Sequence, residues 1–198
     1  MSSTMETEDK ARPARARILK TAARLFYANG FHAVGVDTVV AESGVAKMTL
    51  YRHFPTKDDL VAAYLEEADR QVVAIYAQAT AGKPPLEQIH AILDVTGEIA
   101  QSPGCVGCSF QACVSEFPDV AHPGRVVAER HKKAQVDQLT ALARDAGFSD
   151  AEGLGTALQL VVDGAWVAAR RNQTRVSAAQ VRNAGRALLA GWPSNNRA

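Results

Sequence analysis

Apolar residues recur along most of the chain at intervals of three and four positions, and no stretch shows sustained alternation of apolar and polar residues. From Ile18 to Phe26 the apolar positions follow the pattern i, i+4, i+7 and i+8, which places them on one face of a helix. Segments rich in glycine, proline and serine separate the periodic stretches. The pattern predicts an all-α fold of about nine helices.

The first three expected helices are separated by short breaks. The first should end at Gly30, a residue suited to a left-handed C-cap, and the second should stop at Ser43-Gly44. The third runs from about residue 46 to residue 54, because Pro55 prevents its continuation. Two short helices joined by a tight turn are typical of a helix-turn-helix, whose second helix enters the major groove of DNA.

The remaining breaks and capping pairs organise the rest of the chain as a larger helical domain. Serine or threonine followed three residues later by an acidic residue or glutamine favours helix starts after Thr56, Ser149 and Ser177. We therefore expect a disordered arm over 1–13, a three-helix DNA-binding domain over 14–58, and a ligand-sensing and dimerisation domain over 59–193.

Charge distribution supports this division. The 198-residue chain has a formal net charge of only +1, with 47% hydrophobic and 22% charged residues. Between Lys10 and Lys57, however, nine lysines and arginines stand against two acidic residues, so the rest of the chain is net acidic. A basic excess confined to one end is expected where that end meets phosphates.

The composition also bears on where the protein acts. Residues 1–17 are polar and charged, unlike a secretion signal, and no apolar run approaches the ~20 residues of a membrane span. Three cysteines crowded between Cys105 and Cys113 do not make a disulfide framework. We expect a cytoplasmic protein with no membrane association.

The third expected helix has two distinct faces. Leu50 and Phe54 share one side, where they would pack on the preceding helices. The opposite side presents Met48, Thr49 and Arg52, with Tyr51 on the flank and Lys47 at the N-terminal end. Hydroxyl, aromatic and guanidinium groups suit contacts with phosphates and base edges. The alternative is an ordinary packed helix with a mixed surface.

The same residues carry a family resemblance. The run GVAKMTLYRHFPTKDDL from Gly44 to Leu60 resembles the recognition-helix signature of the tetracycline-repressor (TetR) family. ILKTAARLF from Ile18 to Phe26, followed by Gly30-Phe31, is similar to that family's first helix. GCSF from Gly107, with Glu116-Phe117 and His122-Pro123, resembles one subgroup of its C-terminal domains.

The resemblance implies a set of residues that face DNA. These are Lys47, Met48, Thr49, Tyr51, Arg52 and His53, with Lys57 on a backbone phosphate. Two positions depart from the commonest pattern: Gly35 stands where a threonine usually caps the second helix, and Met48 stands where glycine is frequent. The first departure lacks the hydroxyl that makes the usual phosphate contact. The second disfavours close approach of the backbone, although a methionine can touch a thymine methyl.

The resemblance also implies a homodimer formed by the last two helices. Apolar stripes on these helices supply the candidate interface residues, namely Leu154, Leu158, Val161, Ala165, Val181, Ala184 and Leu188. A dimer supplies the two-fold symmetry needed to bind a palindromic operator. The alternative is that both stripes serve only the core of one chain.

A small, largely apolar ligand is the third implication, bound between the fourth and eighth helices and releasing a repressor from its operator. Its candidate pocket residues are Tyr64, Tyr76, Ile89, Leu93, Phe110, Cys113, Phe117, Asp163 and Trp166. Taken one at a time, each is better explained as an ordinary core residue than as a ligand contact. Asp163 is the most informative, because it interrupts an apolar run and must be paired, protonated or facing a ligand.

Other classes of function remain as alternatives. The chain lacks the common nucleotide-binding, hydrolase and metalloprotease motifs, so we expect no enzyme, no cofactor and no metal. A thiol-redox-responsive regulator, or a small metal or thiol enzyme, would use Cys105, Cys108 and Cys113. We favour structural thiols. A nonspecific DNA-packaging protein would be basic throughout, which this chain is not.

Overall fold

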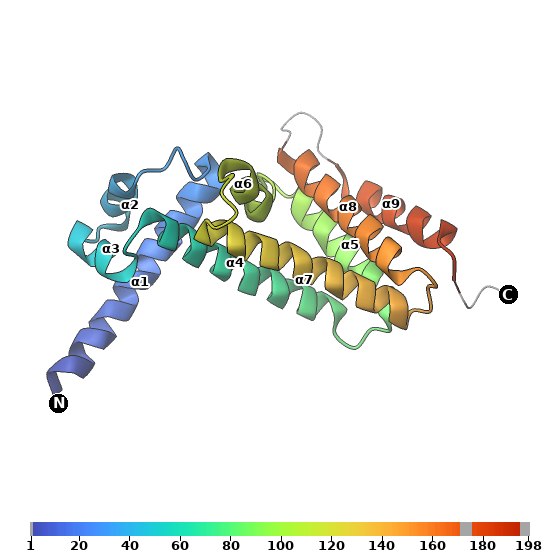
Figure 1. Cartoon of the computed structure of the whole chain (residues 1–198), viewed down its shortest axis with the longest axis horizontal. Helices are drawn as coiled ribbons and strands as arrows, with labels where there is room; N and C mark the ends of the chain where they lie inside the picture. Colours follow the sequence, from blue (N-terminus) through green and yellow to red (C-terminus); the bar gives the residue numbers. More distant parts are fainter. Residues whose placement is uncertain (1, 171–175, 195–198) are drawn as a thin grey trace. The chain divides into compact units, whose positions relative to one another are not determined.

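The computed structural model describes residues 2–170 and 176–194, and across these residues the chain forms nine helices, which confirms the all-α prediction. Apart from one isolated bridge between Phe148 and Ser194, the described residues form no β-structure. In chain order (Figure 1) the helices are α1 (Ser2–Asn29), α2 (Val36–Ser43), α3 (Lys47–His53), α4 (Lys57–Thr80), α5 (Pro85–Gln101), α6 (Ser109–Glu116), α7 (Pro123–Asp145), α8 (Ala151–Arg170) and α9 (Ala178–Gly191).

Helix α1 is longer than the sequence pattern predicts. It begins at Ser2 and so covers most of the range 1–13, where we expected a disordered arm. The sequence from Ser2 to Arg12 contains no glycine or proline, so nothing in it forbids a helix. Pro13 lies inside the helix.

The predicted helix ends agree closely with the structure. Gly30 has a φ of +83°, and Gly44 has a φ of +63° as the left-handed C-cap of α2. Thr56 and Asp59 form the reciprocal pair expected before α4, with the Asp59 N–H donating to Thr56 Oγ1 and the Thr56 N–H to Asp59 Oδ2, both at 3.0 Å. Ser177 caps α9 in the same way with Gln180.

One predicted cap is wrong. Helix α8 begins at Ala151, and the side chain that caps it is Asp150, whose Oδ1 accepts a hydrogen bond of 3.0 Å from the Gly153 N–H. Asp150 competes with Ser149 for the same role because it stands one residue closer to the helix. The Ser149 hydroxyl instead donates to the carbonyl of Pro193.

The chain divides into two compact units, with boundaries inside α4, just before α6 and inside α7. Unit 1 comprises the residues up to Ala68 together with Ser109–Glu129. Within it, α1 packs against α2 and α3. Its core includes Ile18, Phe26, Leu50 and Leu60, all nearly fully buried. Unit 1 therefore contains α6 and the start of α7 as well as α1 to α3, whereas the expected boundary at residue 58 separates α6 and α7 from these helices.

Unit 2 comprises Asp69–Cys108 and the chain from Arg130 onward. Helices α5, α8 and α9 pack on one another around Leu93, Leu154 and Leu158, which are completely buried. Small residues permit the closest approach: a Cβ on Gly97 would lie 2.8 Å from the Cα of Ala178 in α9. Glycine at this position therefore lets α5 and α9 pack closely.

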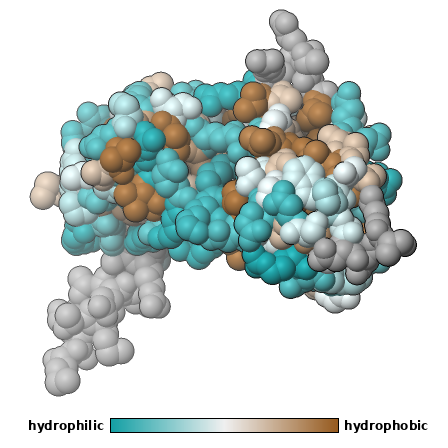
Figure 2. Space-filling view, turned by 45° about the vertical axis from the view of Figure 1, so that its right-hand side comes forward, coloured by the Kyte–Doolittle hydropathy of each residue, from teal (hydrophilic) through white to brown (hydrophobic). Residues whose placement is uncertain are grey.

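Some large hydrophobic residues remain on the surface. The face drawn in Figure 2 is mostly hydrophilic, with hydrophobic residues gathered in patches, one of them toward the α8–α9 end. On α8 the exposed residues include Leu160 and Val167, with exposed fractions of 67% and 48%. No helix among the described residues is long and apolar enough to cross a membrane.

Candidate nucleic-acid interface and ligand site

Helix α3 presents the two faces that its sequence predicts. Leu50 and Phe54 are buried, with exposed fractions of 0% and 2%, and they fix the helix to the core of unit 1. On the opposite face of α3, the Met48 side chain is 80% exposed, and Tyr51 and Arg52 are also exposed. An outward face with a thioether, a phenol and a guanidinium can make both phosphate and base-edge contacts.

Ion pairs and one cation–π contact link helices α1, α2 and α3 to one another. Lys47 Nζ lies 2.7 Å from Asp37 Oδ1, and this hydrogen bond raises the pKa of the lysine. Arg24 of α1 pairs with Glu42 of α2. The Arg15 guanidinium lies 5.1 Å from the centroid of the Phe54 ring. These contacts tie α1, α2 and α3 together next to the exposed face.

The other residues predicted to face DNA are less exposed. Thr49, His53 and Lys57 are half-buried. His53 Nε2 is buried without a hydrogen-bond partner among the described residues, and burial lowers the pKa of the ring. A neutral ring with its Nε2 turned inward does not fit a base-edge contact. Gly35 is the N-cap of α2 and provides no side-chain cap, as its sequence position implies.

The contacts that Glu116 makes in unit 1 were not predicted from the sequence. Glu116, the last residue of α6, accepts hydrogen bonds at Oε2 from the backbone N–H groups of Phe31 (2.8 Å) and His32 (2.7 Å). His32 Nε2 also lies 2.8 Å from the Glu116 carbonyl oxygen. One carboxylate thus binds α6 to the segment that joins α1 to α2, 84 residues away in the chain.

An aromatic stack continues from this contact. Phe117 lies against Phe31 and His32 and stacks on His122, with ring centroids 3.8 Å apart and planes 13° apart. The Gly124 N–H donates to His122 Nδ1, and His122 Nε2 lies 3.3 Å from Asp58 Oδ1 without a hydrogen bond between them. The start of α4 therefore lies against the same cluster.

The structure does not bring the nine predicted pocket residues together. Tyr64, Phe110, Cys113 and Phe117 are core residues of unit 1, and the Tyr64 hydroxyl is 2.6 Å from that of Ser109. Ile89 and Leu93 are buried in the hydrophobic cluster of unit 2, with Trp166 packed against it. These side chains fill the cores of the two units, so most of the predicted set consists of ordinary core residues.

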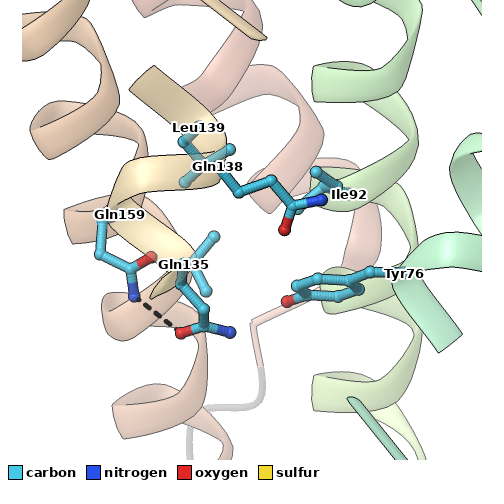
Figure 3. A pocket seen from close by; sticks show the side chains of 7 residues that line it. Tyr76, Ile92, Gln135, Gln138, Leu139 and Gln159 are labelled. Carbon is cyan, nitrogen blue, oxygen red and sulfur yellow. Dashed lines mark hydrogen bonds between the residues drawn. The ribbon is translucent and has the colours of Figure 1, made fainter. Parts of the chain in front are cut away.

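A different set of residues in unit 2 lines a pocket. It is a narrow gap between side chains, partly open to solvent, with no room for a water molecule. Its lining consists of Tyr76, Ile92, Gln135, Gln138, Leu139, Gln159 and Val162 (Figure 3). Of the predicted residues only Tyr76 belongs to it. Glutamines were not candidates because, in sequence, they look like ordinary surface residues of α7 and α8.

Asp163 lies beside this pocket in an ion pair. Its Oδ1 accepts from Lys132 Nζ at 2.6 Å and from Gln159 Nε2 at 2.8 Å. Of the roles expected for a carboxylate in an apolar run, the paired one is therefore the one observed.

Most of the predicted dimer residues are in the wrong place for an interface. Leu154, Leu158, Ala165 and Val181 are buried in the core of unit 2, as the alternative interpretation of these stripes holds. Val161 and Leu188 are half-buried, and Ala184 is exposed. Helix α8 is apolar on two sides, and the side away from the core carries Leu160 and Val167.

The three cysteines form no disulfide. Cys105 and Cys108 are half-buried, whereas Cys113 is fully buried, and burial raises the pKa of its thiol to about 12. Among the described residues, no group of three or more histidine, cysteine and acidic side chains lies close enough to hold a metal ion.

Comparison with known proteins decides the family. Residues 18–64 match the family model described as bacterial regulatory proteins, tetR family. The crystal structure of SCO4454, a TetR-family transcriptional regulator from Streptomyces coelicolor, is 37% identical with a TM-score of 0.85, covering 89% of this chain and 94% of that one. The chain belongs to the TetR family.

Two further relatives of the TetR family agree with this. A TetR transcriptional regulator from Chloroflexus aurantiacus is 26% identical, with a TM-score of 0.77 over 92% of this chain and 95% of that one. YxaF of Bacillus subtilis, an uncharacterised HTH-type transcriptional regulator, is 28% identical over 76% of this chain and 81% of its own length. The exposed face of α3 therefore belongs to the helix-turn-helix of a DNA-binding transcriptional regulator.

Proposed function

We propose that this chain is a cytoplasmic repressor that binds a palindromic operator as a homodimer and leaves it when a small molecule binds in unit 2. The observation that carries the DNA-binding part is the exposed face of α3, formed by Met48, Tyr51 and Arg52 over a fully buried Leu50. Thr49 and Lys47 extend that face toward the N-terminal end of the helix. Lys57 lies at the first turn of α4, where the helix dipole also favours a phosphate.

In the proposed homodimer, the second copy of the chain packs on the exposed side of α8 and α9. Leu160 and Val167 leave apolar surface that one chain does not cover, and Ala184 and Leu188 of α9 contribute further apolar atoms. In a symmetric dimer the same patch from each copy meets its counterpart. Two α3 helices would then contact half-sites about 34–36 Å apart, or a multiple of that distance.

The experiment is a titration of DNA from upstream of the protein's own gene, followed by gel shift and fluorescence anisotropy. Wild-type protein should bind it more tightly than unrelated DNA. Arg52→Ala and Tyr51→Phe should each weaken this binding by about 1–3 kcal/mol if they remove base-edge contacts. Arg144→Ala is the matched control, because that arginine is an exposed ion-pair partner in unit 2.

If both α3 variants bind the DNA like wild type, the assignment of the recognition surface is wrong. A compound that lowers the affinity for the same DNA supports the ligand-released repressor. A compound that raises it would make the protein a ligand-dependent DNA binder instead, because a ligand shifts an equilibrium only toward the state that it binds better.

A further inference from the structure

Met48 places an apolar side chain at the centre of the outward face of α3. At about 100° per residue, Met48 and Arg52 lie about 160° and 200° around the helix axis from Leu50, which is completely buried. Both side chains therefore point away from the core of unit 1. The Met48 side chain is 80% exposed, so it packs on almost nothing in its own chain.

The neighbours of Met48 on this face are polar. Arg52 carries a guanidinium, Tyr51 a phenol, and Lys47 an ammonium group that is paired with Asp37. Each of these groups can donate a hydrogen bond to a phosphate or to a base, whereas a thioether has no donor and is only a weak acceptor. When DNA covers this face, the methionine loses its contact with water. An apolar group on the DNA is the partner that turns this burial into a gain in affinity.

The major groove presents one such group. The edges of guanine, cytosine and adenine carry hydrogen-bond donors and acceptors there, and thymine adds a C5-methyl group. The first residues of a recognition helix contact base edges, and Met48 is the second residue of α3. An unbranched side chain with three rotatable bonds can adjust to the position of a methyl group. The chemistry of Met48 therefore matches thymine.

We propose that Met48 recognises one thymine in each half-site of the operator, by packing its thioether and terminal methyl group against the C5-methyl of the base. The inference rests on the proposed binding of a palindromic operator through α3, and it specifies one base of that operator. Met48 is then a specificity-determining residue, because cytosine and uracil lack the methyl group that it contacts.

The place of this thymine follows from the geometry of α3. Met48 and Arg52 are four residues apart, which is a rise of about 6 Å along the helix axis at about 1.5 Å per residue. Successive base pairs are about 3.4 Å apart, so the thymine should lie within about two base pairs of the base that Arg52 contacts. Guanine is the base that arginine contacts most often. The half-site should therefore contain a thymine and a guanine close together.

The first test uses a duplex selected from random DNA for its binding to the wild-type protein. Each thymine is replaced in turn by uracil, which lacks only the C5-methyl group and still pairs with adenine. Uracil at one position of a half-site should weaken binding about fourfold, the effect of leaving one methyl group unburied, and uracil in both half-sites about fifteenfold. Equal binding of every uracil duplex would overturn the proposal, as would a selected duplex without thymine in its half-sites.

The second test assigns the effect to Met48. Met48→Ala should bind the thymine and uracil duplexes equally, because the contact with the methyl group is gone. Thr49→Ser is the matched control, since it removes a methyl group from the next residue of α3 and should keep the fourfold preference. Met48 is exposed, so Met48→Ala should unfold at the wild-type temperature. A preference for thymine that survives in Met48→Ala, or that disappears in Thr49→Ser, would contradict the assignment.

A third test separates the methyl contact from a change in the shape of the duplex, which can also alter affinity. The sensitive thymine is replaced by cytosine or by 5-methylcytosine, which carries a methyl group on the same ring carbon. Wild-type protein should bind the methylated duplex about fourfold more tightly than the unmethylated one, and Met48→Ala should bind both equally. Equal binding by the wild-type protein would reject the methyl contact.

Failure of this inference is distinguishable from failure of the proposed function. A selection that yields no duplex bound more tightly than unrelated DNA would reject both the operator-binding function and the thymine contact. A selected duplex that loses affinity with Arg52→Ala, and that binds equally well with uracil, would reject the thymine contact alone and leave α3 as the DNA-binding surface.

Discussion

Lys47 at the start of α3 forms an ion pair with Asp37 in the first turn of α2, with Nζ and Oδ1 2.7 Å apart. Both side chains are exposed, at 53% and 81%, so the pair is open to competition from a DNA phosphate. In a complex with DNA, the Asp37 carboxylate would therefore compete with a backbone phosphate for the Lys47 ammonium group.

Asp37→Asn should strengthen binding to DNA. The substitution frees Lys47 and removes a negative charge beside the interface, so the logarithm of affinity should fall more steeply with the logarithm of salt concentration. Anisotropy titrations at several salt concentrations measure both quantities. Asp137→Asn, which breaks a similar exposed pair with Lys133 on α7, is the control and should change neither. Weaker binding by Asp37→Asn would mean that the pair orients the lysine for DNA.

Glu116→Ala should destabilise unit 1. The substitution leaves the N–H groups of Phe31 and His32 without their carboxylate acceptor, and a hydrogen bond to a charged group typically contributes about 1.5–3 kcal/mol to stability. Both a lower unfolding temperature and weaker DNA binding are expected. Glu129→Ala removes an exposed carboxylate of α7 and serves as the control in thermal denaturation. Unchanged stability would show that water replaces the carboxylate without loss.

Leu160→Glu should convert the protein to a monomer. A carboxylate at this exposed position of α8 would be buried without a partner when two copies meet. Sedimentation velocity at micromolar concentration reports the change, and affinity for a palindromic operator should fall with it. Val73→Glu, at a similarly exposed position of α4, should leave the mass of the assembly unchanged. Wild-type protein that sediments as a monomer would reject the dimer itself.

Local features of the fold could be predicted from the sequence because they depend on neighbouring residues. A left-handed glycine at Gly44 and the proline at Pro55 determine where α2 and α3 end, and the spacing of Leu50 and Phe54 determines which face of α3 is buried. These constraints act within a few residues, so periodicity and capping rules are sufficient to find them.

The dimer surface and the pocket could not be predicted in the same way. Helix α8 has apolar residues on two sides, and periodicity alone does not reveal that Leu158 faces the chain's own core while Leu160 faces outward. Gln135 and Gln159 belong to different helices, and nothing near either residue in the sequence shows that they meet. Contacts between distant segments, such as Glu116 with Phe31, need the three-dimensional fold.

Stability should fall as the pH drops below about 6.5. His131 is 4% exposed, and burial lowers the pKa of its ring below 6.5 despite the Asp69 carboxylate 2.6 Å away. As the pH falls, His131 of the unfolded chain therefore takes up a proton before His131 of the folded protein. The contribution of the neutral ring to the free energy of unfolding is fully present above the pKa of the unfolded chain, and it is lost as the pH falls toward the lower pKa of the folded protein. Urea denaturation between pH 5 and 8 measures this slope. His131→Asn should flatten this slope, whereas Gln78→Asn, at an exposed position of α4, should not. An unaltered slope in His131→Asn would assign the effect to another group.

The cysteines should not act as a thiol switch. A thiol must ionise to attack a disulfide or react with a mild oxidant, and burial raises the pKa of Cys113 to about 12, which leaves it protonated at neutral pH. Cys113 is also completely buried, so an oxidant does not reach it without local opening. Cys113 therefore does not respond to diamide, and on the interpretation that Cys105 and Cys108 are structural as well, diamide treatment should leave the affinity for operator DNA unchanged. Cys113→Ser should lower the unfolding temperature, because it places a hydroxyl in an apolar site, whereas Cys105→Ser and Cys108→Ser at half-buried positions should lower it less. A loss of DNA binding that dithiothreitol reverses, and that disappears in Cys105→Ser or Cys108→Ser, would establish a redox-responsive regulator in place of one with structural thiols.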